Sequence, residues 1–337
     1  MAGQTTTYGD ISQRTAVYAM VDMLSHAEPV LVLSKFGKTH PLPKNKADNA
    51  KFRRVIPASR VNVPLVEGVT PTAQKLAYED VAVQMRQWGA YFEISDYVHD
   101  TSEDPVLRDM SQQCGEQAAR TTEAICWGVI RAGTAVYRAN GAAQTDINTP
   151  ITLAKQRAVV RYLKNQKAKK VTKMLSPSEE YATRSVEPAY VAFCHTNVES
   201  DIRNMAGFIP VAQYGSRQPL CPEELGAVED VRYISSPDLD YFADAGGNYA
   251  DSGTAMVTTT GTKADVFPVV YIGMESYGHV PLKGRGAISP KVLNPDTPRG
   301  GDPLGQRGSV GWKAYYQAVI LNDTWMARLE VAATELA

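Results

Sequence analysis

Apolar residues between positions 104 and 139 recur at the spacing of one helix face. Asp104 is a suitable N-cap, Pro105 suits the first helical position, and Asn140-Gly141 supplies a C-terminal stop. The apolar stripe consists of Val106, Met110, Cys114, Ala118, Ile125, Val129, Ala132 and Val136. A helix of about 36 residues would be about 54 Å long. This exceeds the diameter of an ordinary compact domain, so the pattern predicts a long spine helix.

Upstream of this helix, alternating patterns predict two strands, at 51–66 and 80–94. The second is the clearer. In it Val81, Val83 and Met85 face one way, and the residues that face the other way are Ala82, Gln84, Arg86 and Trp88. The turn-rich stretch EGVTPTAQKLAYED joins the two strands. Together they predict a β-hairpin arm about 30 Å long, with a connection longer than a tight turn requires.

The loop of this hairpin contains PLVEGVTP at 64–71, in which a lone carboxylate, Glu67, precedes Gly68. A carboxylate at a glycine turn suits either acid–base chemistry or contact with another molecule. Gly68 permits a backbone bend, and the prolines Pro64 and Pro71 stiffen the chain on either side. No His, Ser or second carboxylate stands at the spacing of a recognisable catalytic set with Glu67. We therefore expect a contact loop.

The remaining segments complete a mixed pattern. Residues 11–27 suit a short amphipathic helix, and the stretch from Lys35 to Arg60 holds eight Lys or Arg against one acid. This basic, proline-broken stretch is typical of an extended arm. A second helix is predicted from 151 to about 170. Short strands and glycine- and proline-rich loops follow, ending in two β segments about Asn322, so the fold class is α+β.

Composition narrows the classes of protein. The chain has 337 residues, 44% apolar and 21% charged, with a net charge of −1, which excludes nucleic-acid or membrane binding by bulk charge. It has neither a signal-peptide core nor an apolar run of about 18 residues, so we expect a soluble protein not exported by a standard route. The four cysteines form no CxxC pair. We expect them to be small buried groups in a reducing compartment.

Two polar groups are candidates for chemistry. His195 with Glu199 and Asp201 suits metal ligation or acid–base catalysis, but we favour a strand end and a helix start capped by Asn197 or Ser200. Elsewhere, the helix and its flank carry eight Lys or Arg and no acid between 155 and 173. This basic set suits a surface that faces nucleic acid. It equally suits a solvated face, or partners for acids on a neighbouring subunit.

The order of elements resembles the major capsid proteins of tailed bacteriophages, specifically the podovirus-type family related to the coliphage N-four capsid protein. Four motifs carry the resemblance: LVEGVTP at 65–71, VQMRQWGAYFEISDYV at 83–98, EDPVLRDM at 103–110 and IRAGTAVYRANG at 130–141. They cover about a quarter of the chain. The rest of the chain is similar in architecture only.

The resemblance implies a tailed-phage shell fold and a structural, non-enzymatic protein. Such a protein assembles itself through pentamers and hexamers into an icosahedral shell around double-stranded DNA. The implied division is an N-terminal arm at 1–50, an extended hairpin loop at 51–98, a spine helix and peripheral domain at 99–189, an axial domain at 190–300, and return strands of the peripheral domain at 301–337. An encapsulin-like compartment shell of the same fold is the nearest alternative. An intracellular hydrolase that uses Glu67 or the His195 group is a more distant one.

The resemblance also implies partners. We expect other copies of the chain, a separate scaffolding protein (because no large extension precedes the arm), a portal, a decoration protein and non-specifically held DNA, but no membrane and no cofactor or metal. We expect the protein in the virion capsid, assembled in the host cytoplasm. The expected assembly contacts are Glu67, Gly68, Pro71, Trp88 and Tyr91, although the aromatic residues Trp88 and Tyr91 equally suit an ordinary core against the chain's own spine. The expected DNA-facing or inter-subunit basic residues are Lys155, Arg157, Arg161, Lys164, Lys167, Lys169 and Lys170.

Overall fold

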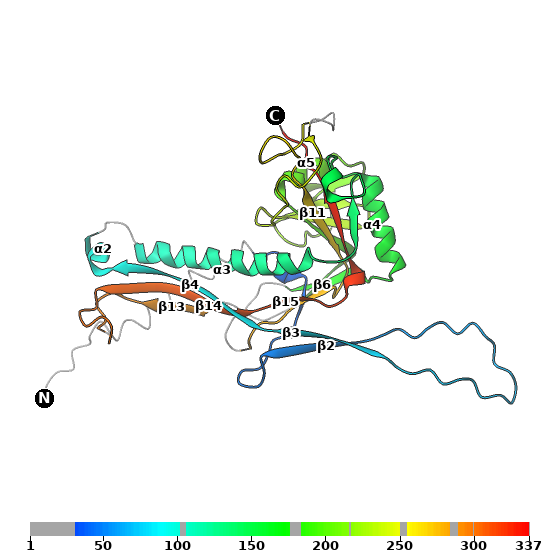
Figure 1. Cartoon of the computed structure of the whole chain (residues 1–337), viewed down its shortest axis with the longest axis horizontal. Helices are drawn as coiled ribbons and strands as arrows, with labels where there is room; N and C mark the ends of the chain where they lie inside the picture. Colours follow the sequence, from blue (N-terminus) through cyan, green and yellow to red (C-terminus); the bar gives the residue numbers. More distant parts are fainter. Residues whose placement is uncertain are drawn as a thin grey trace.

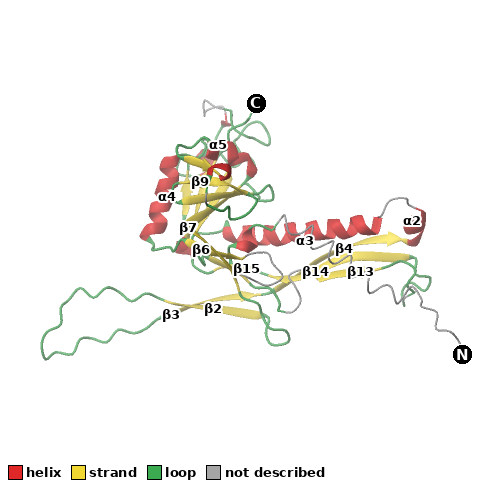
Figure 2. Ribbon diagram, turned by 180° about the vertical axis from the view of Figure 1, so that it is seen from behind, coloured by secondary structure: helices red, strands yellow, loops and turns green. Residues whose placement is uncertain are grey.

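The structure is a computed structural model that describes residues 31–101, 106–175, 183–215, 217–249, 255–283, 289–298 and 300–336. Figure 1 shows three parts: a globular part at the upper right, a long helix lying on a narrow sheet at the left, and a hairpin that reaches out at the lower right. The view from behind shows the same arrangement (Figure 2). The helix predicted at 11–27 lies outside the described residues.

The globular part is built on a mixed sheet of eight strands, ordered β5-β16-β11-β7-β10-β9-β8, with β6 beside β7. Strand β10 runs parallel to β7 and β16 runs parallel to β5, whereas the other pairs are antiparallel. The strands are β5 (Val136–Arg138), β6 (Val171–Leu175), β7 (Thr183–Cys194), β8 (Phe208–Pro210), β9 (Glu224–Val228), β10 (Val231–Ser235), β11 (Phe267–Ile272) and β16 (Met326–Val331).

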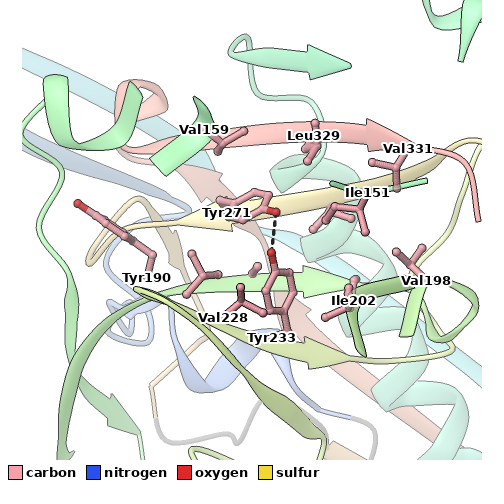
Figure 3. Close-up of a cluster of buried hydrophobic side chains, with 14 of the residues drawn as sticks. Ile151, Val159, Tyr190, Val198, Ile202, Val228, Tyr233, Tyr271, Leu329 and Val331 are labelled. Carbon is pink, nitrogen blue, oxygen red and sulfur yellow. Dashed lines mark hydrogen bonds between the residues drawn. The ribbon is translucent and has the colours of Figure 1, made fainter. Parts of the chain in front are cut away.

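Both faces of this sheet are covered, so its strands are apolar on both sides. Along β7, Tyr190 and Ala192 belong to one core, and Val191 and Phe193 belong to the other, as the two-residue period of a strand requires. The first core packs under α4 (Leu153–Asn165) and α5 (Glu199–Arg203). Within it the hydroxyls of Tyr233 and Tyr271 lie 2.9 Å apart, as Figure 3 shows.

Helix α3 (Val106–Ile130) is the predicted spine, and α2 (Asp96–Thr101) precedes it. The outer half of α3 lies on the three-stranded sheet β13-β14-β4, where Cys114, Ala118 and Ala119 pack against Trp312 and its neighbours. Its last turns cover the second face of the large sheet. The three strands are β4 (Arg86–Ser95), β13 (Ser289–Leu293) and β14 (Arg307–Tyr316).

The predicted end of the spine is wrong. Helix α3 stops at Ile130, nine residues before position 139, and is therefore about 37 Å long. Residues 131–134 form a turn, and Val136–Arg138 pairs with β16 as strand β5. Here Ala135 and Tyr137 pack against the first core. Tertiary pairing has overridden a helical spacing that continued by coincidence. The predicted N-cap Asp104 and Pro105 lie outside the described residues.

The hairpin consists of β2 (Asn49–Val55) and β3 (Tyr78–Gln84), which pair antiparallel from Asn49–Gln84 to Val55–Tyr78. The first strand is shorter than predicted, because residues 56–66 are unpaired beyond one hydrogen bond from Ile56 to Ala77. The predicted strand 80–94 is two strands in two sheets. Its first half pairs with β2, and after Met85 its second half, β4, pairs with β14.

The described N-terminal segment is tied into the body. A short 3₁₀ helix, η2 (Leu33–Lys35), is followed by β1 (Lys38–Thr39), which pairs with β12 (Tyr277–His279) and through it with β15 (Ala318–Ile320). The remaining 3₁₀ turns are η3 (Gln144–Asp146), η4 (Thr196–Val198), η5 (Val211–Gln213) and η7 (Asp323–Trp325).

The second predicted helix also ends early. Helix α4 stops at Asn165 instead of about 170, because Lys167 adopts a left-handed backbone conformation with φ of 55°. The Ala168 N–H then bonds the Leu163 carbonyl at 2.9 Å, which closes the helix end.

Candidate assembly surfaces

The connection between β2 and β3, residues 56–77, is the most exposed part of the described chain, and we call it the hairpin loop. Every residue in it is exposed. Its two legs run out side by side without forming a ladder, and meet in a turn at the tip (Figure 1). The Val69 N–H bonds the Val66 carbonyl at 3.1 Å, and Gly68 has φ of 76°. A four-residue turn with positive φ at its third position favours glycine there.

The hairpin loop carries apolar side chains that its own chain leaves in water. Exposed fractions reach 76% for Leu65 and 74% for Val63. The exposed large apolar residues of this region are Val55, Ile56, Val61, Val63, Leu65, Val66, Val69, Leu76 and Tyr78. Single exposed apolar residues are common, but a contiguous set of this size marks an interaction site.

Glu67 stands at the second position of the tip turn, next to Gly68. A side chain added to Gly68 would meet nothing within 4 Å, so Gly68 is there for its backbone conformation and not for lack of space. Glu67 forms no ion pair with the described residues of its own chain. Pro71 lies in the return leg, exposed like its neighbours.

The base of the hairpin is stiffened by charge. Arg53 faces Asp80 across the strands at 2.7 Å, and Arg54 faces Glu79. Because both pairs are exposed to solvent, they orient the two strands but contribute little to stability. Between this base and the body lies a groove of about 510 Å³, lined in part by Arg53, Pro57 and Lys167.

Trp88 and Tyr91 lie in β4, beneath α3, and not in the projecting hairpin. Trp88 is half-buried against the α3 cluster of its own chain, and its indole N–H donates to the Tyr316 carbonyl at 3.2 Å. Tyr91 points the other way and is 67% exposed. The sheet face away from α3 therefore presents an aromatic ring to solvent.

The basic residues around α4 divide into two groups. Arg157 pairs with Glu229, and Lys164 and Lys170 both pair with Asp230, in the turn between β9 and β10 of the same chain. Hydrogen bonds from these partners lower the pKa of each carboxyl, from Arg157 for Glu229 and from Lys164 for Asp230. The other four have no ion pair with the described residues: Lys155, Arg161, Lys167 and Lys169.

The His195 group is not a single site. His195 Nδ1 accepts the Asn197 N–H at 3.1 Å, so His195 itself caps the short turn η4, and the predicted caps Asn197 and Ser200 are wrong. Asp201 accepts the Thr334 N–H at 2.9 Å, and Glu199 pairs with Arg203. Burial lowers the pKa of His195. Each of these side chains is engaged in local structure.

Cysteine and metal chemistry find little support in the described residues. All four cysteines are free and buried, as predicted, and burial raises the pKa of Cys114 to about 11 and of Cys221 to about 12. Within the described ranges no group of three His, Cys, Asp or Glu is placed to hold a metal ion. In the same ranges no helix is long and apolar enough to cross a membrane.

One buried polar cluster was missed from the sequence. Glu123 in α3 is only 2% exposed and accepts the backbone N–H of Val32 at 2.8 Å and of Leu33 at 3.0 Å. His279 lies nearby with its ring stacked on Tyr316. The available signal was a charged residue four positions after Ala119 and three before Cys126, on a helix face beside the predicted apolar stripe that the structure shows to be buried.

Comparison with known proteins places the chain by sequence and by fold. The major capsid protein of Pseudomonas phage KPP21 is 24% identical over 213 residues, which cover 59% of this chain. They cover 53% of that relative, so the match spans about half of its length.

Solved structures share the fold over nearly the whole chain. The capsid of Ralstonia phage GP4 has a TM-score of 0.63 and 12% identity, covering 90% of this chain and 91% of that one. The capsid of cyanophage Pam1 has a TM-score of 0.56 and 15% identity, with 93% of each chain covered. The SrpI encapsulin of Synechococcus elongatus has a TM-score of 0.51 and 10% identity, covering 89% of this chain and 87% of that one. At these identities the likeness shows the fold alone, and it confirms the predicted α+β shell fold.

The family follows from the sequence itself. Residues 78–329 match the family model described as phage capsid protein. This range includes the spine helix, the sheet beneath it and the strands of the large sheet up to Leu329 in β16. The match covers well over half of the chain and confirms the resemblance drawn from the four motifs. The chain belongs to the phage capsid protein family.

Proposed function

We propose that this chain is the major capsid protein of a tailed phage, which assembles itself through pentamers and hexamers into an icosahedral shell around double-stranded DNA. The observation that carries the proposal is the hairpin loop, residues 56–77, in a chain of the phage capsid protein family. A subunit that leaves a long apolar loop in water gains its remaining burial from other molecules. In a shell built of copies, the neighbouring copy is that molecule.

The shape of the subunit supports the same proposal. The spine and its sheet extend to one side of the globular part and the hairpin extends to the other (Figure 2). An elongated subunit with opposed extensions suits heterologous contacts, in which one surface of each copy meets a different surface of the next. We propose that the subunit is divided into five regions. They are the N-terminal arm at 1–50, the hairpin region at 51–98, the peripheral domain at 99–189, the axial domain at 190–300 and the return strands at 301–337.

Within the hairpin loop, Glu67 is the charged residue of the tip turn, next to Gly68. We propose that Glu67, Gly68 and Pro71 contact the next subunit, and that Tyr91 offers a second contact on the exposed sheet face. Reversing the charge with Glu67→Lys then impairs assembly while the unassembled subunit keeps its thermal stability. Glu79→Lys at the hairpin base is the comparison, because Glu79 is exposed but already paired with Arg54.

The basic residues without a partner within the described chain suit DNA or acids on a neighbour. We propose that Lys155, Arg161, Lys167 and Lys169 serve this role, whereas Arg157, Lys164 and Lys170 stabilise the turn between β9 and β10. Replacing the first four with Glu lowers the DNA retained per particle if the set faces the interior. Normal DNA content with few intact shells assigns the set to subunit contacts instead.

Other partners follow from the same proposal. A separate scaffolding protein, a portal and a decoration protein are proposed to act with the shell, with assembly in the host cytoplasm. The protein acts without catalysis in this scheme. Co-expression with each candidate neighbouring gene, followed by purification of particles, tests these partners one at a time.

An encapsulin-like compartment is the second candidate, because the SrpI encapsulin shares the fold. The two functions differ in what the shell encloses. Expression of the full chain, with a scaffold where needed, followed by size exclusion and negative-stain microscopy, tests assembly. Closed particles or capsomer rings support both shell functions, and a small oligomer under all conditions refutes both. Packaged DNA in particles from infected cells supports the phage function, and a folded enzyme cargo supports the compartment.

A further inference from the structure

Residues Val32–Thr39 form a segment that we call the N-terminal strap, because it crosses the end of the spine helix and enters the body. Val32, Leu33 and Phe36 are buried in the second core, with the Phe36 ring 5.7 Å from that of Phe193. The strap then pairs with β12 as β1. It is held by packing, by a short ladder, by ion pairs of Lys35 and Lys38 nearer the surface, and by polar contacts that lie inside the protein.

The first polar contact is the carboxyl group of Glu123 on α3. Its Oε1 atom accepts the Val32 and Leu33 N–H groups at 2.8 and 3.0 Å, which closes the start of η2. Its Oε2 atom is a weaker second acceptor of the Leu33 N–H, at 3.2 Å. A proton can reside on Oε2 while Oε1 keeps both short hydrogen bonds. The Glu123 carboxyl group can therefore hold the strap in its neutral, protonated form.

The second contact is the ring of His279 on β12. Its Nδ1 atom shares a hydrogen bond of 2.5 Å with the Tyr316 hydroxyl. Its Nε2 atom is buried and makes no hydrogen bond with the described residues. The strap passes so closely that a side chain at Gly37 would come within 2.2 Å of this Nε2. A proton added at Nε2 would place a buried cation directly under the strap.

The other titratable groups around this cluster come from each packed element. Cys126 lies on α3, and Tyr277 on β12 donates to the Leu33 carbonyl at 2.6 Å. Burial raises the pKa of Cys126, Tyr277 and Tyr316, so all three are neutral at ordinary pH. Lys35 on the strap is the nearest cation, and it pairs outward with Glu223 at 3.4 Å. Lys35 and the backbone N–H groups of the strap favour a charged Glu123, and the Leu33 backbone favours a charged His279, but burial outweighs them at both groups.

We propose that docking of the N-terminal strap onto the body is controlled by protonation: the strap is docked when Glu123 carries a proton and His279 does not. This inference concerns the single chain and does not depend on the proposed shell function. When the strap leaves, water reaches both groups and each returns to its ordinary titration. Docking is therefore coupled to uptake of a proton at Glu123 and to exclusion of a proton from His279.

The direction of the pH dependence follows from the two groups. Burial raises the pKa of Glu123 from 4.5 to about 8, against the opposing effect of its backbone N–H donors and Lys35. Its contribution to docking is complete below pH 4.5 and is lost as pH rises to 8. Burial lowers the pKa of His279 from 6.5 to about 4, so its contribution is present above pH 6.5 and lost below. The two effects cancel between pH 4.5 and 6.5. Between pH 6.5 and 8 the loss at Glu123 dominates. It is about 16-fold, and the end of the His279 titration offsets about twofold of it, so docking weakens by about 10-fold.

Hydrogen exchange of the full-length protein at a fixed assembly state tests this pH-dependent docking of the strap. Protection factors of peptides covering 32–39, corrected for intrinsic exchange, are measured from pH 4.5 to 9 against peptides from β11 as an internal reference. In the wild type we expect strap protection to fall by about 10-fold between pH 6.5 and 8. Constant protection across that range, relative to β11, overturns the proposal.

Two variants separate the groups. Glu123→Gln removes the fall above pH 6.5 and reveals a loss of protection below it, while His279→Gln extends the fall down to pH 4.5. Asp201→Asn, which removes a different buried carboxylate, keeps the wild-type profile. If the strap of the Glu123→Gln protein is unprotected at every pH, the proposal is judged from the pH profiles of the wild type and of His279→Gln. A fall in protection above pH 6.5 in both supports the proposal, and constant protection overturns it. A fall above pH 6.5 that persists in a docked Glu123→Gln protein refutes the assignment to Glu123.

Discussion

Removing the apolar character of the hairpin loop is expected to abolish assembly without affecting folding. The variant replaces Val63, Leu65 and Val66 with serine. These side chains are 74%, 76% and 65% exposed, so the folded subunit gains almost nothing from them. Surface substitutions of this kind change the free energy of unfolding by at most about 0.5 kcal/mol. The unassembled variant should therefore melt within a few degrees of the wild type.

The effect on assembly is worked from the area that these side chains still have to bury. Full burial of one Val or Leu side chain contributes about 1.5–3 kcal/mol. About two thirds to three quarters of each remains available, which gives about 1–2 kcal/mol per residue and about 4 kcal/mol for the three. This corresponds to a contact about 1000-fold weaker. Because every subunit repeats the contact, the concentration needed for shell formation rises steeply.

Light scattering against protein concentration, with negative-stain imaging of the products, measures this effect. Leu304→Ser is the matched control, since Leu304 is 75% exposed but lies outside the hairpin. The control should assemble at the wild-type concentration. The role of the loop would be refuted if the triple variant formed shells at the same protein concentration as the wild type and these shells dissociated at the same denaturant concentration.

Three further outcomes are expected. Gly68→Val forces a β-branched residue to a φ of 76°, at a cost of about 1–2 kcal/mol. The yield of shells should therefore fall for Gly68→Val, whereas Gly68→Asn should be tolerated. Equal yields for the two variants would contradict this expectation. Asp230→Asn should lower the free energy of unfolding at pH 7 by less than about 1 kcal/mol, because its lysine pairs are partly exposed. That difference should vanish as pH falls below 3.8, since the pKa of Asp230 is lowered in the folded state. Gln156→Leu should cost about 2–4 kcal/mol in chemical denaturation, because it leaves the Val228 carbonyl and the Tyr233 hydroxyl short of a partner.

The elements with strong local signals were predictable. The spine from Val106 onward, the hairpin and α4 each carry a period or a turn motif that the structure realises, and Gly68 takes the bend that its sequence context indicated. These signals depend on neighbours within a few residues. They are independent of how distant segments pack.

The features that sequence reasoning missed depend on distant partners. The spine pattern continues through Ala132 and Val136, and only pairing with β16, nearly two hundred residues away, turns that segment into β5. The division of the 80–94 strand is set in the same way, by β2 on one side and β14 on the other. Glu123 acquires its role from a strap about ninety positions earlier.

The division at Met85 also fixes the direction of the hairpin. Strand β4 is paired with β14 along its entire length, so the chain leaving it at Met85 has a set direction. The Met85 N–H bonds the Asp48 carbonyl at 2.9 Å, and its side chain packs beside Val83 against the body. The hairpin is thus a separate two-stranded sheet whose second strand runs directly into the sheet under the spine. Because the direction of the hairpin is already set, less orientational entropy is lost when its tip binds a neighbour. More of the free energy gained by burying the apolar side chains of the loop then contributes to the affinity of the contact.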